Sequence, residues 1–433
     1  MVALIVVILI DTSIVTVYDL VDKNYLPTGD KLTLFAINSM LCIFLQLVLI
    51  RHIRHSLDNV RPITRLSSKI FNVIPFFAVG ATGAIIALLS TQQFYYGYYN
   101  KYLSIALVSV SYAASSALVI RLSMLFLSWY KSERSMVIFL YFVSMALIAF
   151  SLIMTAIVTD FKIGERPTEI AEFVGGSANI YVGRYELLDR IYTVSSVISF
   201  ISIWTTTAIL MKYYRDNLKN AIAYWTIVSI PLGYFLINYI YSSILAGALV
   251  PYLTLDPIGF SILITALLSL SKPIGGLTFG VAFWRISRSV GYEKNIRSFM
   301  VISGWGIFLL FGANQATSQI LYPYPPFGLA TLTVLILAAY LTLIGIYNSA
   351  MLVSLNSDLR RTIHKHALES KLLGLIGRAE MENEVQKTVT EIVKDREVSG
   401  LESEISVELN EVELKKYLEL VARELRKEKS EKI

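Results

Sequence analysis

The chain has 433 residues, of which 55% are hydrophobic and only 16% are charged, and its mean hydropathy is +0.60. Soluble domains carry about 25% charged residues, so this composition excludes an ordinary soluble globular protein. From Asn356 onward the chain holds 15 Lys and Arg against 17 Asp and Glu, so the net charge of +6 comes from the apolar part that precedes it. We therefore predict no nucleic-acid partner.

Ten apolar blocks recur almost to the end of the chain, each near the roughly 20 residues that a helix needs to cross a bilayer. They are Val2–Tyr18, Leu32–Ile50, Ile70–Ser90, Tyr102–Ile120, Met136–Val158, Ile191–Met211, Ala221–Leu245, Ile258–Trp284, Phe299–Ile320 and Leu329–Tyr347. The first block has no basic segment before it and no small-residue cleavage site after it, so we interpret it as a helix rather than a signal peptide. The sequence thus predicts an all-α fold, a polytopic transmembrane helical bundle of about ten helices.

The distribution of Lys and Arg predicts the orientation, because cytoplasmic loops carry an excess of both. Alternate short loops hold 14 basic residues: Arg51, Arg54, Arg61, Arg65, Lys69, Lys131, Arg134, Lys212, Arg215, Lys219, Arg285, Arg288, Lys294 and Arg297. The loops between them are aromatic or proline-rich, as in Gln92–Tyr99, Val250–Thr254 and Leu321–Pro326. We therefore predict a multi-pass protein of the cell (cytoplasmic) membrane, whose lipid bilayer is its main partner and whose termini are both cytoplasmic.

The sequence divides into a transmembrane bundle over residues 1–350 and a short cytoplasmic helical tail over residues 351–433. The tail repeats apolar residues at helical spacing, and Asn410 followed by Glu413 predicts the start of its second helix. Two amphipathic helices of this size do not bury a large core of their own. We expect the helices at 356–430 to pack on each other, on the basic loops, on a cytoplasmic protein partner or on a second copy of the chain.

Enzyme signatures are missing from this tail, which has no Gly-rich phosphate loop and no His-Glu-x-x-His motif. The single cysteine, Cys42, excludes a disulfide framework and a thiolate metal cluster. The four histidines form two pairs without a third ligand nearby. We therefore predict no catalytic activity, no cofactor and no metal.

Two ionisable residues fall inside the predicted spans, where a charge costs roughly 3 kcal/mol. Lys272 lies near the middle of the eighth block and Asp11 in the middle of the first, and each is the natural charge partner of the other if the helices touch. Pro273 removes a backbone donor beside Lys272, and Gly275 and Gly276 weaken the helix further. A helix broken at this depth exposes ends that bind ions. Two interpretations stay open, a ligand or ion site and a kinked helix whose Lys pairs with an acid purely for packing.

Asn314 and Gln315 of the ninth block are further candidates for lining the same cavity, with packing as the alternative. The blocks also divide into two sets of five, residues 1–160 and 190–350, which an inverted repeat would relate. Matching interruptions in the third and eighth blocks favour such a repeat: Pro75, Gly80 and Gly83 in one, and Pro273, Gly276 and Gly280 in the other. Gly and Pro are common in membrane helices, so chance is the alternative.

The stretch Asn348–Lys394 resembles the tails of uncharacterised archaeal multi-pass membrane proteins. The residues that carry the resemblance are Ser357-Asp358-Leu359-Arg360-Arg361 and Gly377-Arg378-Ala379-Glu380-Met381-Glu382, and more loosely Ser271-Lys272-Pro273-Ile274-Gly275-Gly276. The resemblance implies an archaeal cell membrane, and it carries over no functional residue.

These features favour a membrane sensor or regulatory module with a non-catalytic helical output tail. One alternative is a secondary transporter with a midplane site at the broken eighth helix. Another is a non-catalytic subunit of a larger membrane complex. The tail motivates the first interpretation, because it comprises nearly a fifth of the chain and lacks catalytic residues.

Overall fold

The structure is a computed structural model. It describes residues 3–8, 10–11, 28–58, 67–164, 186–212, 221–240, 270–289, 294–315, 326–355 and 371–398. These residues form helices and include no strand, so the predicted all-α class is confirmed. The chain divides into two units, Met1–Asn383 and Glu384–Ile433.

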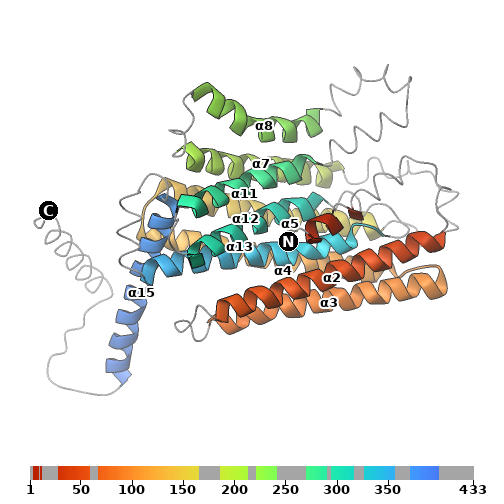
Figure 1. The fold of residues 1–433 in the computed structure, drawn as a ribbon, viewed down its shortest axis with the longest axis horizontal. Helices are drawn as coiled ribbons and strands as arrows, with labels where there is room; N and C mark the ends of the chain where they lie inside the picture. Colours follow the sequence, from red (N-terminus) through yellow and green to blue (C-terminus); the bar gives the residue numbers. More distant parts are fainter. Residues whose placement is uncertain are drawn as a thin grey trace, which may run out of the picture. The chain divides into compact units, whose positions relative to one another are not determined.

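Long helices make up the first unit (Figure 1). In chain order the labelled helices are α2 (Thr28–Asp58), α3 (Ser67–Tyr96), α4 (Lys101–Ser132), α5 (Met136–Gly164), α7 (Glu186–Lys212), α8 (Ala221–Ile240), α11 (Ser271–Ser289), α12 (Lys294–Gln315), α13 (Leu329–Leu355) and α15 (Lys371–Val398). Within the described residues, seven are long and apolar enough to cross a membrane, namely α2, α3, α4, α5, α7, α12 and α13. The chain is therefore a multi-pass membrane protein.

The other three predicted spans lie partly outside the described residues. Of the first, the structure describes residues 3–8, 10 and 11, all helical. The seventh corresponds to α8, whose apolar part, Tyr224–Ile237, is shorter than a full span. Of the eighth, only the part from Leu270 onward is described. The predicted second helix of the tail, from Asn410, and the predicted loops at 250–254 and 321–325 also fall outside the described residues.

Helix α13 lies at the centre of the bundle, where it contacts α12, α4, α2 and α3. Every residue from Pro326 to Ile346 is buried. The sequence explains this position, because α13 carries no charged residue along its whole length and is apolar on every face. In Figure 1, α8 and the α2–α3 hairpin lie at opposite edges of the first unit.

Glycines allow α11, α12 and α13 to approach one another closely. A Cβ on Gly280 of α11 would lie 2.6 Å from the carbonyl oxygen of Gly304 on α12, and one on Gly306 would lie 2.5 Å from the backbone nitrogen of Thr342 on α13. A Cβ on Gly345 of α13 would likewise lie 2.5 Å from the carbonyl oxygen of Phe299 on α12. Small residues at such crossings supply the van der Waals contact that holds membrane helices together, since lipid removes the usual hydrophobic driving force.

The first half of α15 belongs to the bundle. Leu373, Ile376 and Ala379 are fully buried, and a Cβ on Gly377 would collide with the side chain of Val353 on α13. The boundary between the two units falls at Asn383, within α15 and inside the predicted tail. The tail therefore begins as a packed element of the bundle.

Capping residues mark the two ends of the bundle. At one end the side chain of Asn100 accepts a hydrogen bond from the backbone nitrogen of Tyr102 at 2.9 Å and begins α4. At the other end the backbone nitrogen of Glu133 donates to the carbonyl oxygen of Trp129 at 2.8 Å and closes the same helix. We call these the Asn100 end and the Glu133 end. In the predicted topology the Glu133 end faces the cytoplasm.

Substituting Gly306 by Ala should destabilise the bundle, because the new methyl group meets the backbone of Thr342. We expect Gly306→Ala to lower the free energy of unfolding by about 2 kcal/mol. Gly312→Ala is the matched control on the same helix, since nothing lies within 4 Å of its Cβ position. The control should keep or slightly raise the stability, because alanine is the better helix former. Denaturation in detergent measures both, and equal losses would contradict the packing role of Gly306.

Candidate functional site

Lys272 lies in the first turn of α11 and is only 6% exposed. Its Nζ donates to the hydroxyl of Tyr192 on α7 at 3.2 Å, and it stands 5.5 Å from the centroid of that ring. At about 1.5 Å rise per residue, Lys272 is about 20 Å along α11 from Arg285. In the predicted topology Arg285 faces the cytoplasm, so Lys272 is predicted to lie nearer the outer side of the bilayer.

A small cavity adjoins Lys272, and its walls come from α5, α7, α8, α11 and α12. The space open to the centre of a water molecule is about 20 Å³, room for a single water or small ion. The lining residues are Ile148, Ser151, Leu152, Ser196, Ser199, Phe200, Phe235, Lys272, Leu310, Phe311 and Asn314. The lining thus contains one cation, three hydroxyls and one amide among apolar side chains.

Pro273 and the two glycines shape the wall of this cavity. Pro273 occupies the first turn of α11, where a missing N–H costs little, and the helical bond from Ile274 nitrogen to Leu270 oxygen is intact at 2.9 Å. A Cβ on Gly275 would collide with the ring of Phe200, and one on Gly276 would lie 2.7 Å from Cβ of Phe311. The glycines therefore let aromatic rings pack against α11, and the helix runs unbroken through them to Ser289. The segment before residue 270 is outside the described residues.

The cavity is walled by a cluster of phenylalanine rings. Phe200 stacks on Phe235 with centroids 3.8 Å apart and 5° between the planes. It meets Phe311 edge-on at 5.9 Å and 89°. Both Phe200 and Phe235 are fully buried. The cluster gives the cavity a largely apolar wall beside Lys272.

Asn314 lines the cavity and connects it to α4. Its Oδ1 accepts a hydrogen bond from the hydroxyl of Tyr112 at 3.0 Å, and Tyr112 is fully buried. Gln315, the last described residue of α12, is not among the lining residues. Of the residues singled out in the sequence, the structure therefore brings Lys272 and Asn314 to one cavity, with Gly275 and Gly276 packed on its phenylalanines.

Asp11 lies elsewhere and has other partners. Its Oδ2 accepts hydrogen bonds from the backbone nitrogens of Gly328 and Thr331, at 3.2 and 3.3 Å, and from the hydroxyl of Thr331 at 2.5 Å. It is fully buried. A carboxylate at this place acts as an N-cap for α13, supplied by a different helix, and it offsets the positive end of the helix dipole. Asp11 therefore does not pair with Lys272, as the sequence had suggested it could.

Tyr192, Tyr112 and the serines of the cavity were not identified from the sequence. Ser196 and Ser199 are three residues apart and so lie on one face of α7, a spacing that could have marked them as lining residues. The two tyrosines carried no such signal, because aromatic residues are frequent throughout this chain. Their contact with the cavity depends on which helices are neighbours.

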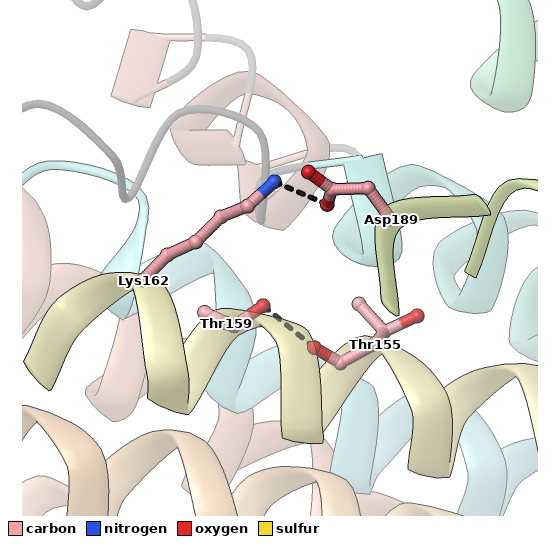
Figure 2. A network of polar contacts seen from close by, with 4 residues as sticks. All are labelled: Thr155, Thr159, Lys162 and Asp189. Carbon is pink, nitrogen blue, oxygen red and sulfur yellow. Dashed lines mark hydrogen bonds and ion pairs between the residues drawn. The ribbon is translucent and has the colours of Figure 1, made fainter. Parts of the chain in front are cut away.

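Polar contacts hold α4, α5 and α7 together at the Asn100 end. Lys162 of α5 and Asp189 of α7 form an ion pair of 2.7 Å, and on the preceding turn of α5 Thr159 donates to the carbonyl oxygen of Thr155 (Figure 2). The two charged side chains are 33% and 46% exposed, so water screens their attraction. Lys101 of α4 adds a bond of 2.8 Å to the carbonyl oxygen of Gly164.

Comparison with known proteins adds no relative: no family model, curated protein or solved structure matches the chain. The resemblance of the tail to archaeal membrane proteins therefore stays a prediction. In the part of the chain that the structure describes, no three His, Cys, Asp or Glu side chains gather in a way that could hold a metal ion. The candidate site is thus the Lys272 cavity, which can hold a small polar or charged ligand.

Removing the carboxylate of Asp11 should destabilise the protein, because the donors of Gly328 and Thr331 would lose their acceptor in a buried place. We expect Asp11→Ala to lower the free energy of unfolding by about 2 kcal/mol, and Asp11→Asn, which keeps one acceptor oxygen, to lower it less. The control is Asp30→Ala, which removes an exposed acid from the first turn of α2 and should cost less than about 1 kcal/mol. Denaturation of the three variants in detergent measures the differences. If Asp11→Ala and Asp30→Ala cost the same, the capping role is wrong.

Proposed function

We propose that the protein is a membrane sensor in which occupancy of the Lys272 cavity alters how the start of α15 docks on the bundle. The observation that carries this proposal is that a single helix, α4, contacts both places. In the first half of α4, Tyr112 donates a hydrogen bond to Asn314 of the cavity. Near the end of α4, Trp129 donates a hydrogen bond to Glu380 of α15. The proposal deepens the interpretation of the tail as an output element.

The tail contact is specific and buried. Nε1 of Trp129 donates to Oε2 of Glu380 at 2.7 Å, and the two residues are 0% and 6% exposed. Asn383 adds two bonds, accepting from Ser132 at 2.8 Å and donating to Ser128 at 3.0 Å. A buried carboxylate that loses its donor costs more than an ordinary hydrogen bond contributes. The docked arrangement of α15 therefore depends strongly on the position of the last turn of α4.

A rigid helix is a suitable connection between the two contacts. Tyr112 and Trp129 are both fully buried, and they lie about 25 Å apart along the axis of α4. Packed helices respond to a ligand by small shifts or rotations as whole bodies. A displacement of α4 at Tyr112 would therefore also move Trp129. Coupling of this kind requires that the ligand binds the two arrangements of α4 with different affinity.

The residues beyond Asn383 are the proposed output. They form a separate unit, and in the predicted topology they lie in the cytoplasm, where a protein partner or a second copy of the chain would bind them. The absence of phosphate-loop and metalloprotease motifs from their sequence supports a non-catalytic role. Positive charge in the loops predicted to face the cytoplasm supports the same side for both termini.

A secondary transporter is the second candidate, and a specific feature favours it. Lys272 is a buried cation beside a small polar cavity, and the helix that carries it meets α12 through paired glycines at Gly280 and Gly304. Ionisable residues at membrane depth mark transport pathways as well as sensory sites. Solute flux into proteoliposomes that contain the full chain separates the two, because a sensor moves no solute.

Changing the cavity should change the tail if the proposal is correct. We expect Lys272→Met to alter the amide hydrogen exchange of residues 371–383 by about fivefold or more, the lower end of common coupling strengths. The measurement is hydrogen exchange with mass spectrometry on the full chain in lipid nanodiscs. Lys162→Met is the matched control, since it removes the same charge from a partly exposed ion pair.

The control should leave the exchange of residues 371–383 unchanged. Unaltered exchange in Lys272→Met, with both variants folded, would overturn the sensor proposal and leave the transporter as the better candidate. If Lys272→Met does not fold, Asn314→Ala tests the same connection, because it removes the acceptor for Tyr112 without changing a charge.

A further inference from the structure

The two oxygens of the Asp11 carboxyl group have different surroundings. Oδ2 accepts three hydrogen bonds, from the backbone nitrogens of Gly328 and Thr331 and from the hydroxyl of Thr331. Oδ1 is also buried, and it has no hydrogen-bond partner among the residues that the structure describes. An ionised carboxylate shares its charge between both oxygens, so each of them needs donors. In a neutral acid one oxygen accepts and the other carries the proton, which fits the division observed here.

A polar stretch of α2 faces the same end of α13. Sγ of Cys42 donates to the carbonyl oxygen of Ala330 at 3.5 Å. One turn later, Nε2 of Gln46 donates to the hydroxyl of Thr333 at 2.7 Å. Residues three and four positions apart share one side of a helix, so positions 38 and 39 belong to this side of α2 as well. The carboxyl group of Asp11 and this side of α2 thus both lie against the first turns of α13.

Two polar side chains of α2 in this region have no partner. Asn38 and Ser39 are 6% and 0% exposed. The amide of Asn38 is close enough to Asp11 to affect its charge, although Nδ2 meets no acceptor at hydrogen-bond distance among the described residues. The hydroxyl of Ser39 likewise has no partner in that part of the chain. Buried polar groups are almost always satisfied, so an unmatched donor beside an unmatched carboxyl oxygen requires an explanation.

The surroundings of Asp11 supply no compensating positive charge. Among the described residues it forms no ion pair, and α13 carries no charged residue along its length. The described part of its own helix, residues 3–8 and 10, is entirely apolar. Other charged residues of α2 and α3 lie at the far end of the α2–α3 hairpin. The remaining titratable groups are Cys42 on the facing side of α2, Asp30 and Lys31 at the start of α2, the exposed Tyr95 and Tyr96 of α3, and Tyr340 and Tyr347 on the other side of α13.

Burial and hydrogen bonding act on the charge of Asp11 in opposite directions. Removal from water favours the neutral acid, whereas the donors at Oδ2 and the positive end of α13 favour the ionised form. The neutral acid keeps Oδ2 as an acceptor, so the cap on α13 is present in both forms. Only the ionised form also needs a donor at Oδ1, and the adjacent Nδ2 of Asn38 can supply it.

We propose that Asp11 is a proton-binding site inside the bundle, which exchanges a proton at Oδ1 and couples this exchange to the hydrogen bonding of Asn38. When the proton is bound, Oδ1 is a hydroxyl group and Nδ2 of Asn38 is released. When the proton leaves to water, Nδ2 donates to the ionised oxygen and ties α2 to the first helix. Ionisable residues inside membranes commonly serve proton transfer. The site is separate from the Lys272 cavity and does not depend on the sensor proposal.

Infrared difference spectroscopy of the full chain in lipid nanodiscs tests this site, because a carboxylic acid and a carboxylate absorb at different frequencies. Subtracting the spectrum of Asp11→Asn from that of the wild type isolates the band of this acid. We expect the band to disappear as the pH is raised from about 4 to about 10. Asp30→Asn, which changes an exposed acid of α2, is the matched control and should keep the band.

Replacing Asn38 tests the coupling to α2. Without the amide the ionised Oδ1 loses its donor, so Asn38→Ala should hold the proton to a pH higher by about one unit. This shift is a tenfold change in proton affinity, which a purely structural role of Asn38 would not produce. Asn295→Ala, at an exposed position of α12, is the control and should titrate like the wild type.

Three results would overturn the proposal. The absence of an Asp11 band at every pH would mean that the acid stays ionised. A band of equal size at every pH would mean that the proton is never released. A transition in Asn38→Ala at the wild-type pH would contradict the coupling. If Asp11→Asn does not fold, the comparison of Asn38→Ala with Asn295→Ala decides, because both keep the acid.

Discussion

The amino end of α13 has no access to water, because every residue from Pro326 to Ile346 is buried. The first N–H groups of any helix lack partners within the helix, and in a dry interior each unmet donor is costly. The carboxylate of Asp11 accepts hydrogen bonds from the backbone N–H groups of Gly328 and Thr331. Helices α2, α3, α4 and α12 all pack on α13, so the position of this one end affects most of the bundle.

Around that centre, the close approaches of α11, α12 and α13 depend on glycines. The same close approach brings the start of α11 against Phe200 and Phe311, and so forms the wall of the Lys272 cavity. In the described residues, the wall of the cavity is formed by this packing of helices. Pro273 fits the first turn of α11 without distorting the described backbone.

The sequence predicted the fold class and seven spans well, because long apolar blocks and the alternation of basic loops follow from the bilayer alone. It also identified Lys272 and Asn314, since buried polar groups among apolar residues are visible in the sequence itself. It did not reveal Tyr112, Tyr192 or the capping of α13 by Asp11. The partners of Tyr112, Tyr192 and Asp11 lie 202, 80 and at least 317 positions away along the chain. Local periodicity does not indicate which distant helices become neighbours. The packing of the first half of α15 against the bundle could not be predicted from the sequence either. An amphipathic pattern shows that one face of a helix is covered, but it does not identify the covering element.

The bond between Asp11 and Thr331 spans 320 residues and has a consequence for biogenesis. A ribosome makes Asp11 long before α13, so early in synthesis the acid lacks the donors of Gly328 and Thr331. The cap on the amino end of α13 can therefore form only after most of the chain has been made. Arrival of α13 then brings the donors to the acid and closes the bundle around it. Chains truncated before α13 lack these donors altogether, so the contacts of Asp11 depend on completion of the bundle.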